Sequence, residues 1–312
     1  MRNTVVKRAA FVLLSCALML GAAEWIPARE APPQAALPDV YVYEGYAVST
    51  EAGFDRKSLD YAAQKFRQLY DSYLTGNDGH IYLSVIPDKG SFTEPPEGYV
   101  PASAQETAEA LLAQLDFVQY ADIAPGLSLA DYYRTDPHWR QECLIPVART
   151  LVQAMGVPLT GDFRENTMDV PFYGTYADKA EEPLAADTLR YLTSETLDAC
   201  TVYDYETERQ ETLYDLSAVE TDTPYDLYLQ GSRSLLRIDS PLAATDRTLV
   251  VFRDSFGSSL IPLLSESYRT IYAVDIRYLS SQLLGRFLTL DGSEDVLFLY
   301  STMVLQNSRT MK

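Results

Sequence analysis

Short apolar runs alternate with helix-like segments late in the chain, and this alternation constrains the fold more than any other feature of the sequence. The runs 249–252, 270–274 and 295–300 are rich in β-branched and aromatic residues, as buried strands are. The segments between them, 258–268 and 280–288, are expected to be helices. A β-α-β-α-β order predicts a parallel sheet with right-handed crossovers.

The first of these strands leads directly into a turn that contains Ser255 and then into the helix 258–268. In open α/β sheets, ligands bind beyond the carboxyl ends of the strands, which is where this serine is expected. The first turn of the helix also offers unpaired N–H groups to an oxyanion. Ser255 is therefore a candidate nucleophile. The alternative is that Asp254 and Ser255 only cap the helix, because both residue types are common caps.

Other elements are expected earlier in the chain. The predicted elements are a hairpin over 40–48, a helix over 55–74, a strand over 80–86, and helices over 103–115 and 140–155. The turn 87–90, which ends its strand, should lie at the same edge as Ser255 if the sheet is parallel. Residues 158–240 are polar and tyrosine-rich, and we expect an insertion or β-rich cap there, with a hairpin around 206–210.

The amino-terminal segment 1–23 has the pattern of a targeting sequence, with a basic start and an uncharged apolar run from residue 9. A cleavable signal peptide is the first interpretation, and an uncleaved membrane anchor is the second. Lipidation at Cys16 is a third alternative. Residues 24–38 are rich in proline and alanine and are expected to be a linker, followed by a folded domain over 39–312. The folded part is therefore predicted to be extracytoplasmic, either secreted or anchored at the cell surface.

The formal net charge of -19 argues against nucleic acid as a partner, because such binding requires Lys and Arg to neutralise phosphates. Cys143 and Cys200 are able to pair outside the cytoplasm, but two cysteines do not make a disulfide framework. The chain has only two histidines and no Cys/His cluster with metal-binding spacing. We therefore expect no metal and no cofactor.

The chain has two histidines, so there are only two candidate histidine bases for Ser255. His138 follows Asp136 by two residues, and in an extended segment such residues point to the same side. Pro137 favours extended geometry at Asp136. The carboxylate is then able to orient the imidazole, as the acid of a catalytic triad does. The alternative is that Asp136 caps the next helix while His138 and Trp139 pack in the core.

The segment 133–139, together with 254–257 downstream, resembles the DHHW family and the related alginate O-acetyltransferases of the SGNH-hydrolase-like superfamily. Further segments with this resemblance are 85–89, 172–176 and 268–278. In one departure from the pattern, Pro137 stands where the family has the first of two histidines. The resemblance implies a three-layer α/β fold with a parallel sheet flanked by helices and a β-rich insertion.

The resemblance also implies roles for individual residues. Ser255 would be the nucleophile, His138 the general base and then acid, and Asp136 its orienting group. Backbone N–H groups would hold the oxyanion. The candidate oxyanion donors are the amide of Ser255 or Phe256, together with Gly231 or Gly174. The candidate substrate contacts are Lys89, Tyr173 and Arg253.

The activity implied by the resemblance is that of a carbohydrate O-acetyltransferase or acetylesterase acting on cell-surface polysaccharide through an acyl-enzyme. The sequence does not choose between the two, because the choice depends on whether a sugar hydroxyl or water accepts the acyl group. A transferase would require a membrane-bound acyl-donor protein as a partner. The alternative from another class is a catalytically inactive surface or envelope binding protein that retains the fold.

Overall fold

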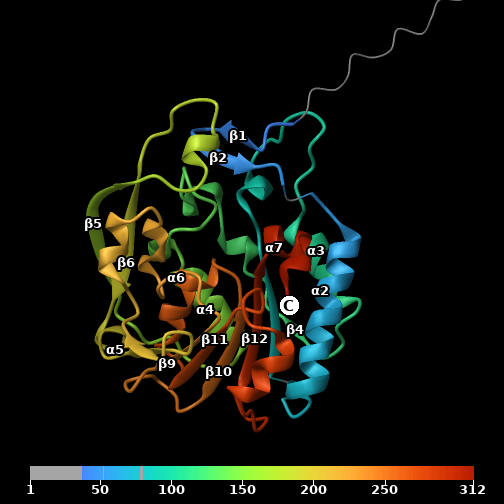
Figure 1. The fold of residues 1–312 in the computed structure, drawn as a ribbon, viewed down its shortest axis with the longest axis vertical. Helices are drawn as coiled ribbons and strands as arrows, with labels where there is room; N and C mark the ends of the chain where they lie inside the picture. Colours follow the sequence, from blue (N-terminus) through green and yellow to red (C-terminus); the bar gives the residue numbers. More distant parts are fainter. Residues whose placement is uncertain (1–36, 52, 78–79) are drawn as a thin grey trace, which may run out of the picture. The chain divides into compact units, whose positions relative to one another are not determined.

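A sheet of eight strands runs through the molecule and carries helices on both faces (Figure 1). The computed structural model describes residues 37–51, 53–77 and 80–312. The predicted targeting segment and most of the predicted linker lie outside the described residues. No helix in the described part of the chain is long and apolar enough to cross a membrane.

Five neighbouring strands of this sheet are parallel, as the β-α-β-α-β order predicts. In spatial order they are β4 (Gln119–Tyr120), β3 (Ile81–Ile86), β12 (Asp295–Ser301), β10 (Thr248–Arg253) and β11 (Thr270–Val274). Three antiparallel neighbours extend the sheet beyond β11, namely β9 (Leu235–Asp239), β7 (Thr201–Asp204) and β8 (Arg209–Glu211). All residues of β3 and β12 are buried, as expected for parallel strands covered on both faces.

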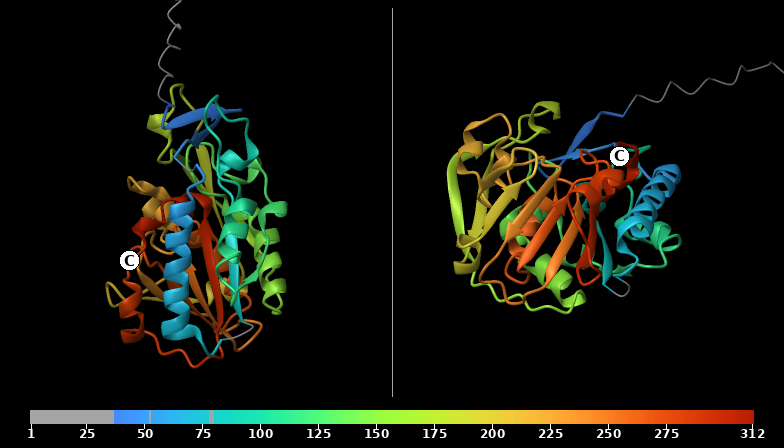
Figure 2. Two further views of the ribbon diagram at one scale, coloured as in Figure 1. Left: turned by 90° about the vertical axis from the view of Figure 1, so that its right-hand side faces the viewer. Right: turned by 60° about the horizontal axis from the view of Figure 1, so that its bottom comes forward.

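Successive residues of each strand serve two hydrophobic cores. In β12, Leu297 and Leu299 belong to one core, and Val296 and Phe298 belong to the other. The first core is closed by α4 (Ile145–Ala154) and α6 (Gly257–Leu264), and the second by α2 (Arg56–Leu69), α3 (Ala104–Leu112) and α7 (Thr302–Gln306). The molecule therefore has the predicted three layers, and Figure 2 shows the strands lying side by side between the helices.

Helix α2 illustrates how the sequence sets one of these layers. The Asp55 carboxylate accepts a hydrogen bond from the Lys57 N–H at 2.9 Å and so caps the first turn. Leu59, Phe66 and Leu69 then recur at helical spacing and are fully buried against the sheet. The helix continues as a π-helical segment, Tyr70–Leu74, which covers the rest of the predicted range 55–74.

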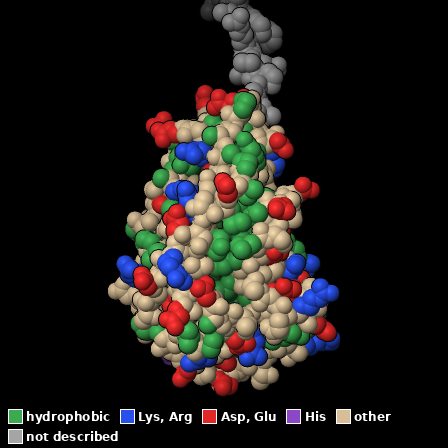
Figure 3. All heavy atoms as spheres, turned by 90° about the vertical axis from the view of Figure 1, so that its left-hand side faces the viewer, with side chains coloured by type: hydrophobic (Ala, Val, Ile, Leu, Met, Phe, Trp, Pro, Cys, Tyr) green, Lys and Arg blue, Asp and Glu red, His purple; other side chains and the backbone are tan. Residues whose placement is uncertain are grey.

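Two small hairpins lie outside the central sheet. β1 (Val40–Tyr43) pairs with β2 (Tyr46–Ser49) around Glu44 and Gly45, whose φ angles are 49° and 80°. β5 (Arg164–Phe172) pairs with β6 (Asp187–Thr193), and a short helix α5 (Glu195–Asp198) follows. Figure 3 shows the face of the molecule near β5 and β6, where hydrophobic side chains gather in a band among both acidic and basic side chains.

Two predicted helices differ from the structure. Residues 280–288 were expected to form an α-helix, but they form only a 3-10 helix, Ser281–Arg286. Leu284 and Leu288 are buried in the core whereas Leu283 and Phe287 are exposed, so only a narrow apolar face supports the turn. The helix predicted from residue 140 begins at Ile145 and is preceded by a 3-10 turn, Gln141–Cys143. Pro146 suits the first turn of the helix because its missing N–H would have no partner there.

The carboxyl ends of β3, β10 and β12 meet at one edge of the sheet, as predicted for the turns 87–90 and 254–257. Asp254, which follows β10, accepts hydrogen bonds at 2.7 Å from both the N–H and the hydroxyl of Ser301 at the end of β12. Asp88, which follows β3, accepts one at 2.9 Å from Thr302. Buried carboxylates therefore tie the three strand ends together and fix the edge that carries Ser255.

Candidate active site

Ser255, His138 and Asp136 form one hydrogen-bonded chain in the structure. The His138 Nε2 atom lies 2.8 Å from Ser255 Oγ, and His138 Nδ1 lies 2.5 Å from Asp136 Oδ1. The Asp136 side chain is 3% exposed and that of His138 is 12% exposed. Ser255 is half-buried. This is the order of contacts that activates a serine hydroxyl in a triad.

The Asp136 carboxylate is held on both oxygens. Oδ1 also accepts the His138 N–H at 3.1 Å, and Oδ2 accepts the Thr175 N–H at 3.1 Å. Burial acts to raise the pKa of Asp136, but the charge of His138 and these hydrogen bonds outweigh it and lower the pKa. Gly174 lies so close that a Cβ there would be 2.2 Å from Asp136 Cβ. The backbone at 174–175 therefore packs against the acid, and the Thr175 N–H adds to the larger effect of His138 in keeping it ionised.

The imidazole is also held by aromatic contacts. Tyr225 stacks on the His138 ring, with centroids 3.8 Å apart and planes 10° apart. The ring of Phe256 lies 4.8 Å away on a tilted plane. The Tyr225 hydroxyl donates to Ser259 Oγ at 2.9 Å, which ties this stacking partner to α6. The ring plane of His138 is thus fixed by groups that also contact the serine-bearing turn.

Trp139 explains why two segments more than a hundred residues apart meet. Its indole N–H lies 2.9 Å from the Phe256 carbonyl oxygen and 3.0 Å from Ser259 Oγ, and the side chain is fully buried. Gln141 adds a hydrogen bond of 2.6 Å from its side-chain amide to the Ser259 carbonyl. The segment that supplies the base is therefore anchored by its own next residues to the helix after Ser255.

The loop before Asp136 is held in place by two buried side chains, those of Asp187 and Lys89. The Asp187 carboxylate accepts the N–H groups of Arg134 and Thr135, each at 2.8 Å. The Lys89 ammonium donates to the carbonyl oxygens of Tyr133 at 3.1 Å and Arg134 at 3.4 Å. These bonds satisfy buried backbone groups that would otherwise be unpaired. The position of Asp136 and His138 is thus determined by residues on β6 and on the turn after β3.

The trio opens on a cleft of about 360 Å³. Ser255 and His138 lie on its floor, and Tyr173, one of the predicted substrate contacts, lines its wall with 56% of its surface exposed. Gly174 and Gly231 also line this cleft.

The described part of the chain holds no group of His, Cys, Asp and Glu side chains placed to bind a metal ion. Cys143 and Cys200 are both free thiols.

Most of the predicted oxyanion donors are used within the fold. The Phe256 N–H donates to Asp254 Oδ1 at 3.0 Å, and the Gly174 N–H donates to Thr135 Oγ1 at 2.9 Å. The Gly231 N–H donates to the Tyr228 carbonyl oxygen at 3.1 Å. These three amides are therefore not free for a substrate. The Ser255 N–H has no partner among the described residues and remains available.

Two predicted substrate contacts are buried instead of exposed to the cleft. Arg253 is 0% exposed and donates to Ser258 Oγ at 2.9 Å and to the carbonyl oxygens of Gly231 and Arg233. Lys89 is 2% exposed beneath the loop described above. Both cations hold backbone carbonyls in place, so in this structure neither reaches a bound substrate.

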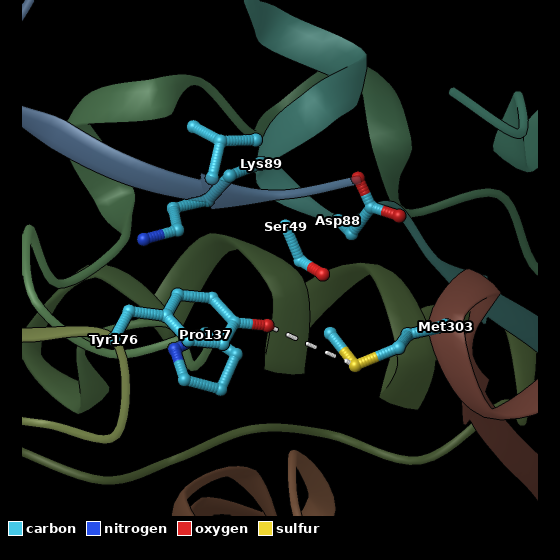
Figure 4. A pocket seen from close by; sticks show the side chains of 7 residues that line it. Ser49, Asp88, Lys89, Pro137, Tyr176 and Met303 are labelled. Atoms are coloured by element: carbon cyan, nitrogen blue, oxygen red, sulfur yellow. Dashed lines mark hydrogen bonds between the residues drawn. The ribbon is translucent and has the colours of Figure 1, made fainter. Parts of the chain in front are cut away.

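Lys89 and Pro137 face a second, much smaller cavity behind the triad segment (Figure 4). Its volume of about 10 Å³ has room for one water molecule at most. The ring of Tyr176 lies beside the ammonium of Lys89, which is 5.3 Å from the ring centroid. Because Pro137 lines this cavity and not the cleft that Ser255 and His138 line, a proline at this position leaves the hydrogen-bonded chain intact.

Lys89→Met is expected to change how stability depends on pH. Burial lowers the pKa of Lys89 from 10.5 to about 7, against the attraction of Asp136, Asp187 and Asp88. Between these values the unfolded chain binds a proton that the folded chain does not, so stability rises with pH. We expect the difference in unfolding free energy, wild type minus variant, to rise by about 1 kcal/mol per pH unit from about pH 7 to 9.

Urea unfolding monitored by circular dichroism at several pH values measures this difference. The matched control is Lys57→Met, which removes the same charge from an exposed position on α2. A difference for Lys89→Met that stays constant with pH would mean that Lys89 remains charged in the fold.

With the geometry established, comparison with solved structures shows which proteins share this fold. A DHHW family protein from Eubacterium siraeum superposes with a TM-score of 0.67 at 21% identity, over 86% of this chain and 92% of that one. The chain has the fold of a DHHW family protein. This confirms the fold resemblance that the motifs 133–139 and 254–257 predict.

Two further neighbours have the same fold. Bacillus cereus PatB1 with a sulfonyl adduct gives a TM-score of 0.65 at 16% identity, covering 85% of this chain and 95% of that one. The O-acetyltransferase domain of Pseudomonas putida AlgJ gives 0.52 at 15% identity, covering 86% and 93%. The sequence matches no protein-family model, and no curated protein matches it in sequence. The DHHW-like fold thus rests on structural similarity.

Sequence reasoning did not identify several residues that hold the site. Thr175 follows the predicted Gly174 directly, but no motif marks it as a partner of Asp136. Tyr225 lies in a polar, tyrosine-rich stretch with no periodic pattern. The pairing of Asp187 with the loop at 134–135 also has no local signal. The resemblance of segment 172–176 and the candidates Tyr173, Gly174 and Gly231 pointed to this region, but they did not mark Tyr225 or Asp187.

Proposed function

We propose that this protein is an extracytoplasmic, serine-dependent carbohydrate O-acetyltransferase or acetylesterase that acts on cell-surface polysaccharide. The observation that carries the proposal is the chain of contacts from Ser255 through His138 to Asp136 at the floor of an open cleft. The shared fold with the AlgJ O-acetyltransferase domain supports acyl chemistry at this site. The basic and apolar amino-terminal segment supports an extracytoplasmic location.

In the first half-reaction, Ser255 Oγ attacks the acyl carbon of an acetyl ester while its proton passes to His138 Nε2. The carbonyl π electrons move to the oxygen and form a tetrahedral oxyanion. When this collapses, the bond to the leaving alcohol breaks and the alcohol takes the proton from Nε2, which leaves acetyl-Ser255. Asp136 stays ionised throughout and stabilises the imidazolium.

The oxyanion requires N–H donors at the floor of the cleft. The Ser255 N–H is one, because it has no partner among the described residues. The Ser232 N–H is the second candidate, since Ser232 lines the same cleft and its amide also donates to no described group. Arg253 supports this arrangement by holding the carbonyl oxygens on either side of Ser232, those of Gly231 and Arg233.

In the second half-reaction, the oxygen of a sugar hydroxyl or of water gives its proton to His138 and bonds to the acyl carbon. The Ser255 Oγ bond to that carbon then breaks, and the proton returns to Oγ. A sugar acceptor gives transfer and water gives hydrolysis, so occupancy of the cleft decides between the two activities. For transfer to polysaccharide outside the cell, we propose a membrane-bound protein as the source of acetyl groups.

Trapping of the acyl-enzyme tests this function. Wild-type protein mixed with p-nitrophenyl acetate and quenched in acid should show one added acetyl group on the peptide that contains Ser255, by mass spectrometry. The Ser255→Ala variant should show none. If the folded wild-type protein carries no acetyl group on Ser255, the enzymatic proposal fails, and a non-catalytic surface or envelope binding protein becomes the better account.

A further inference from the structure

The wall of the active-site cleft carries carboxylates and no cationic side chain. Asp178, Asp222 and Asp226 line it, and Asp178 and Asp222 are exposed. None of the residues that line the cleft is Lys or Arg. We infer that the acceptor is a glycan without acidic groups, either neutral or amine-bearing. This inference rests on the proposed function and narrows its substrate class.

The cations nearest to the cleft do not offset these carboxylates. Arg253 and Lys89 are buried and donate to backbone carbonyls, as described above. Arg233 pairs with the buried Asp204 at 3.0 Å. Lys179 follows Asp178 in the chain, but its ammonium lies 5.7 Å from the ring centroid of Tyr176, and the residue is not part of the cleft lining. An incoming sugar therefore meets carboxylates in this lining and no Lys or Arg.

The other polar groups of the cleft suit an uncharged sugar. Ser232 offers a hydroxyl group, and the Thr223 hydroxyl, which donates to Asp226 Oδ2 at 2.7 Å, is able to accept from a sugar. The exposed ring of Tyr173 offers a flat apolar surface for a sugar face. A carboxylate or phosphate on the sugar would find no cation to pair with. It would also be repelled by three carboxylates, at a cost that we expect to weaken productive binding about tenfold at low salt.

Two para-substituted benzenesulfonyl fluorides of opposite charge measure this preference directly at Ser255. The cationic probe is 4-(2-aminoethyl)benzenesulfonyl fluoride, and the anionic probe is 4-carboxybenzenesulfonyl fluoride. In each reaction, Ser255 Oγ bonds to sulfur, fluoride leaves, and His138 takes the hydroxyl proton. The rate of labelling at Ser255, followed by mass spectrometry, is divided by the rate of hydrolysis of each probe in buffer.

We expect the corrected rate for the cationic probe to exceed that for the anionic probe about tenfold at about 10 mM salt. The ratio should approach one at about 1 M salt, where the Debye length falls to about 3 Å. The double variant Asp178→Asn/Asp222→Asn should lower the ratio about threefold at low salt. The matched control Asp71→Asn/Glu97→Gln makes the same change in net charge at exposed positions outside the cleft lining and should leave the ratio unchanged.

A polymer probe extends the test to the acceptor itself. Calorimetry on the Ser255→Ala variant compares oligogalacturonate with its methyl ester, which has the same backbone without the charge. We expect the methyl ester to bind more tightly, and equal affinities would overturn the inference. So would equal corrected labelling rates for the two sulfonyl fluorides. Loss of all labelling at Ser255 is a different result, because it removes the proposed function itself.

Discussion

Replacing Ser255 with alanine should lower kcat for p-nitrophenyl acetate by about a thousandfold or more. The Ser255 hydroxyl is the atom that lies 2.8 Å from His138 Nε2, and alanine removes it without adding volume. The variant should bind sugar oligomers as the wild type does, because the lost group acts only on the acyl carbon. Steady-state kinetics and calorimetry on the same preparation separate these two effects.

Ser91→Ala is the matched control, because it removes an exposed serine hydroxyl that lies outside the cleft lining. Its kcat should equal that of the wild type. The Ser255→Ala variant should also unfold at the wild-type urea concentration, since within the described residues the Ser255 hydroxyl makes no hydrogen bond other than that with His138. Equal ester hydrolysis by wild type and Ser255→Ala would place the nucleophile elsewhere.

The parts of this site that the sequence predicts are those governed by short-range pattern. The order of β10, the Ser255 turn and α6 can be predicted because a buried strand and the following helix have different patterns of hydrophobic residues. The contact between Asp136 and His138 is present, but the extended segment predicted for it is wrong. Residues 134–138 form a bend, in which Asp136 Oδ1 accepts the backbone N–H of His138 as well as contacting its ring. Both arguments use only neighbours in the chain. The structure confirms the strand, turn and helix around Ser255, whereas at 136–138 it confirms the contact but not the predicted backbone geometry.

The contacts that complete the site could not be predicted, because they join segments distant in sequence. Thr175 reaches Asp136 only once β5 and β6 have placed the backbone beside it. Tyr225 stacks on His138 from a 3-10 turn, Pro224–Leu227, that has no periodic signature. Pattern and spacing fix which residues share a face, whereas tertiary packing decides which faces meet.

Burial explains why the predicted roles of the cationic residues differ from their positions. Lys and Arg are usually exposed, so an expectation that Lys89 and Arg253 contact substrate follows the ordinary preference. In this fold each ends a buried strand or begins the turn after it, where backbone carbonyls require donors. A cation donates hydrogen bonds to several such carbonyls at once. The sequence alone does not show which backbone carbonyls will be buried without a donor.

Asp136→Asn should lower kcat about a thousandfold while leaving KM within about threefold of wild type. Asparagine keeps the shape, but its single oxygen replaces only one of the two that accept the His138 and Thr175 N–H groups. It also removes the charge that orients and stabilises the imidazolium. The pKa of Asp136 is lowered in the fold, so its charge stabilises the folded state at neutral pH and is lost in acid. The variant should therefore also unfold more easily at neutral pH than at acid pH, relative to wild type.

Thr175→Val is a milder variant that weakens the hydrogen bonding of the Asp136 carboxylate without removing its charge. It removes the hydroxyl that lies 3.5 Å from Asp136 Oδ2, but the backbone N–H at 3.1 Å remains, so kcat should fall less than about tenfold. Residues that act as one catalytic unit are not additive. The double variant Ser255→Ala/Asp136→Asn should therefore be no slower than Ser255→Ala alone. A double variant slower by the product of the two single effects would show that Asp136 acts independently of Ser255, and the hydrogen-bonded chain would then not be the catalytic unit.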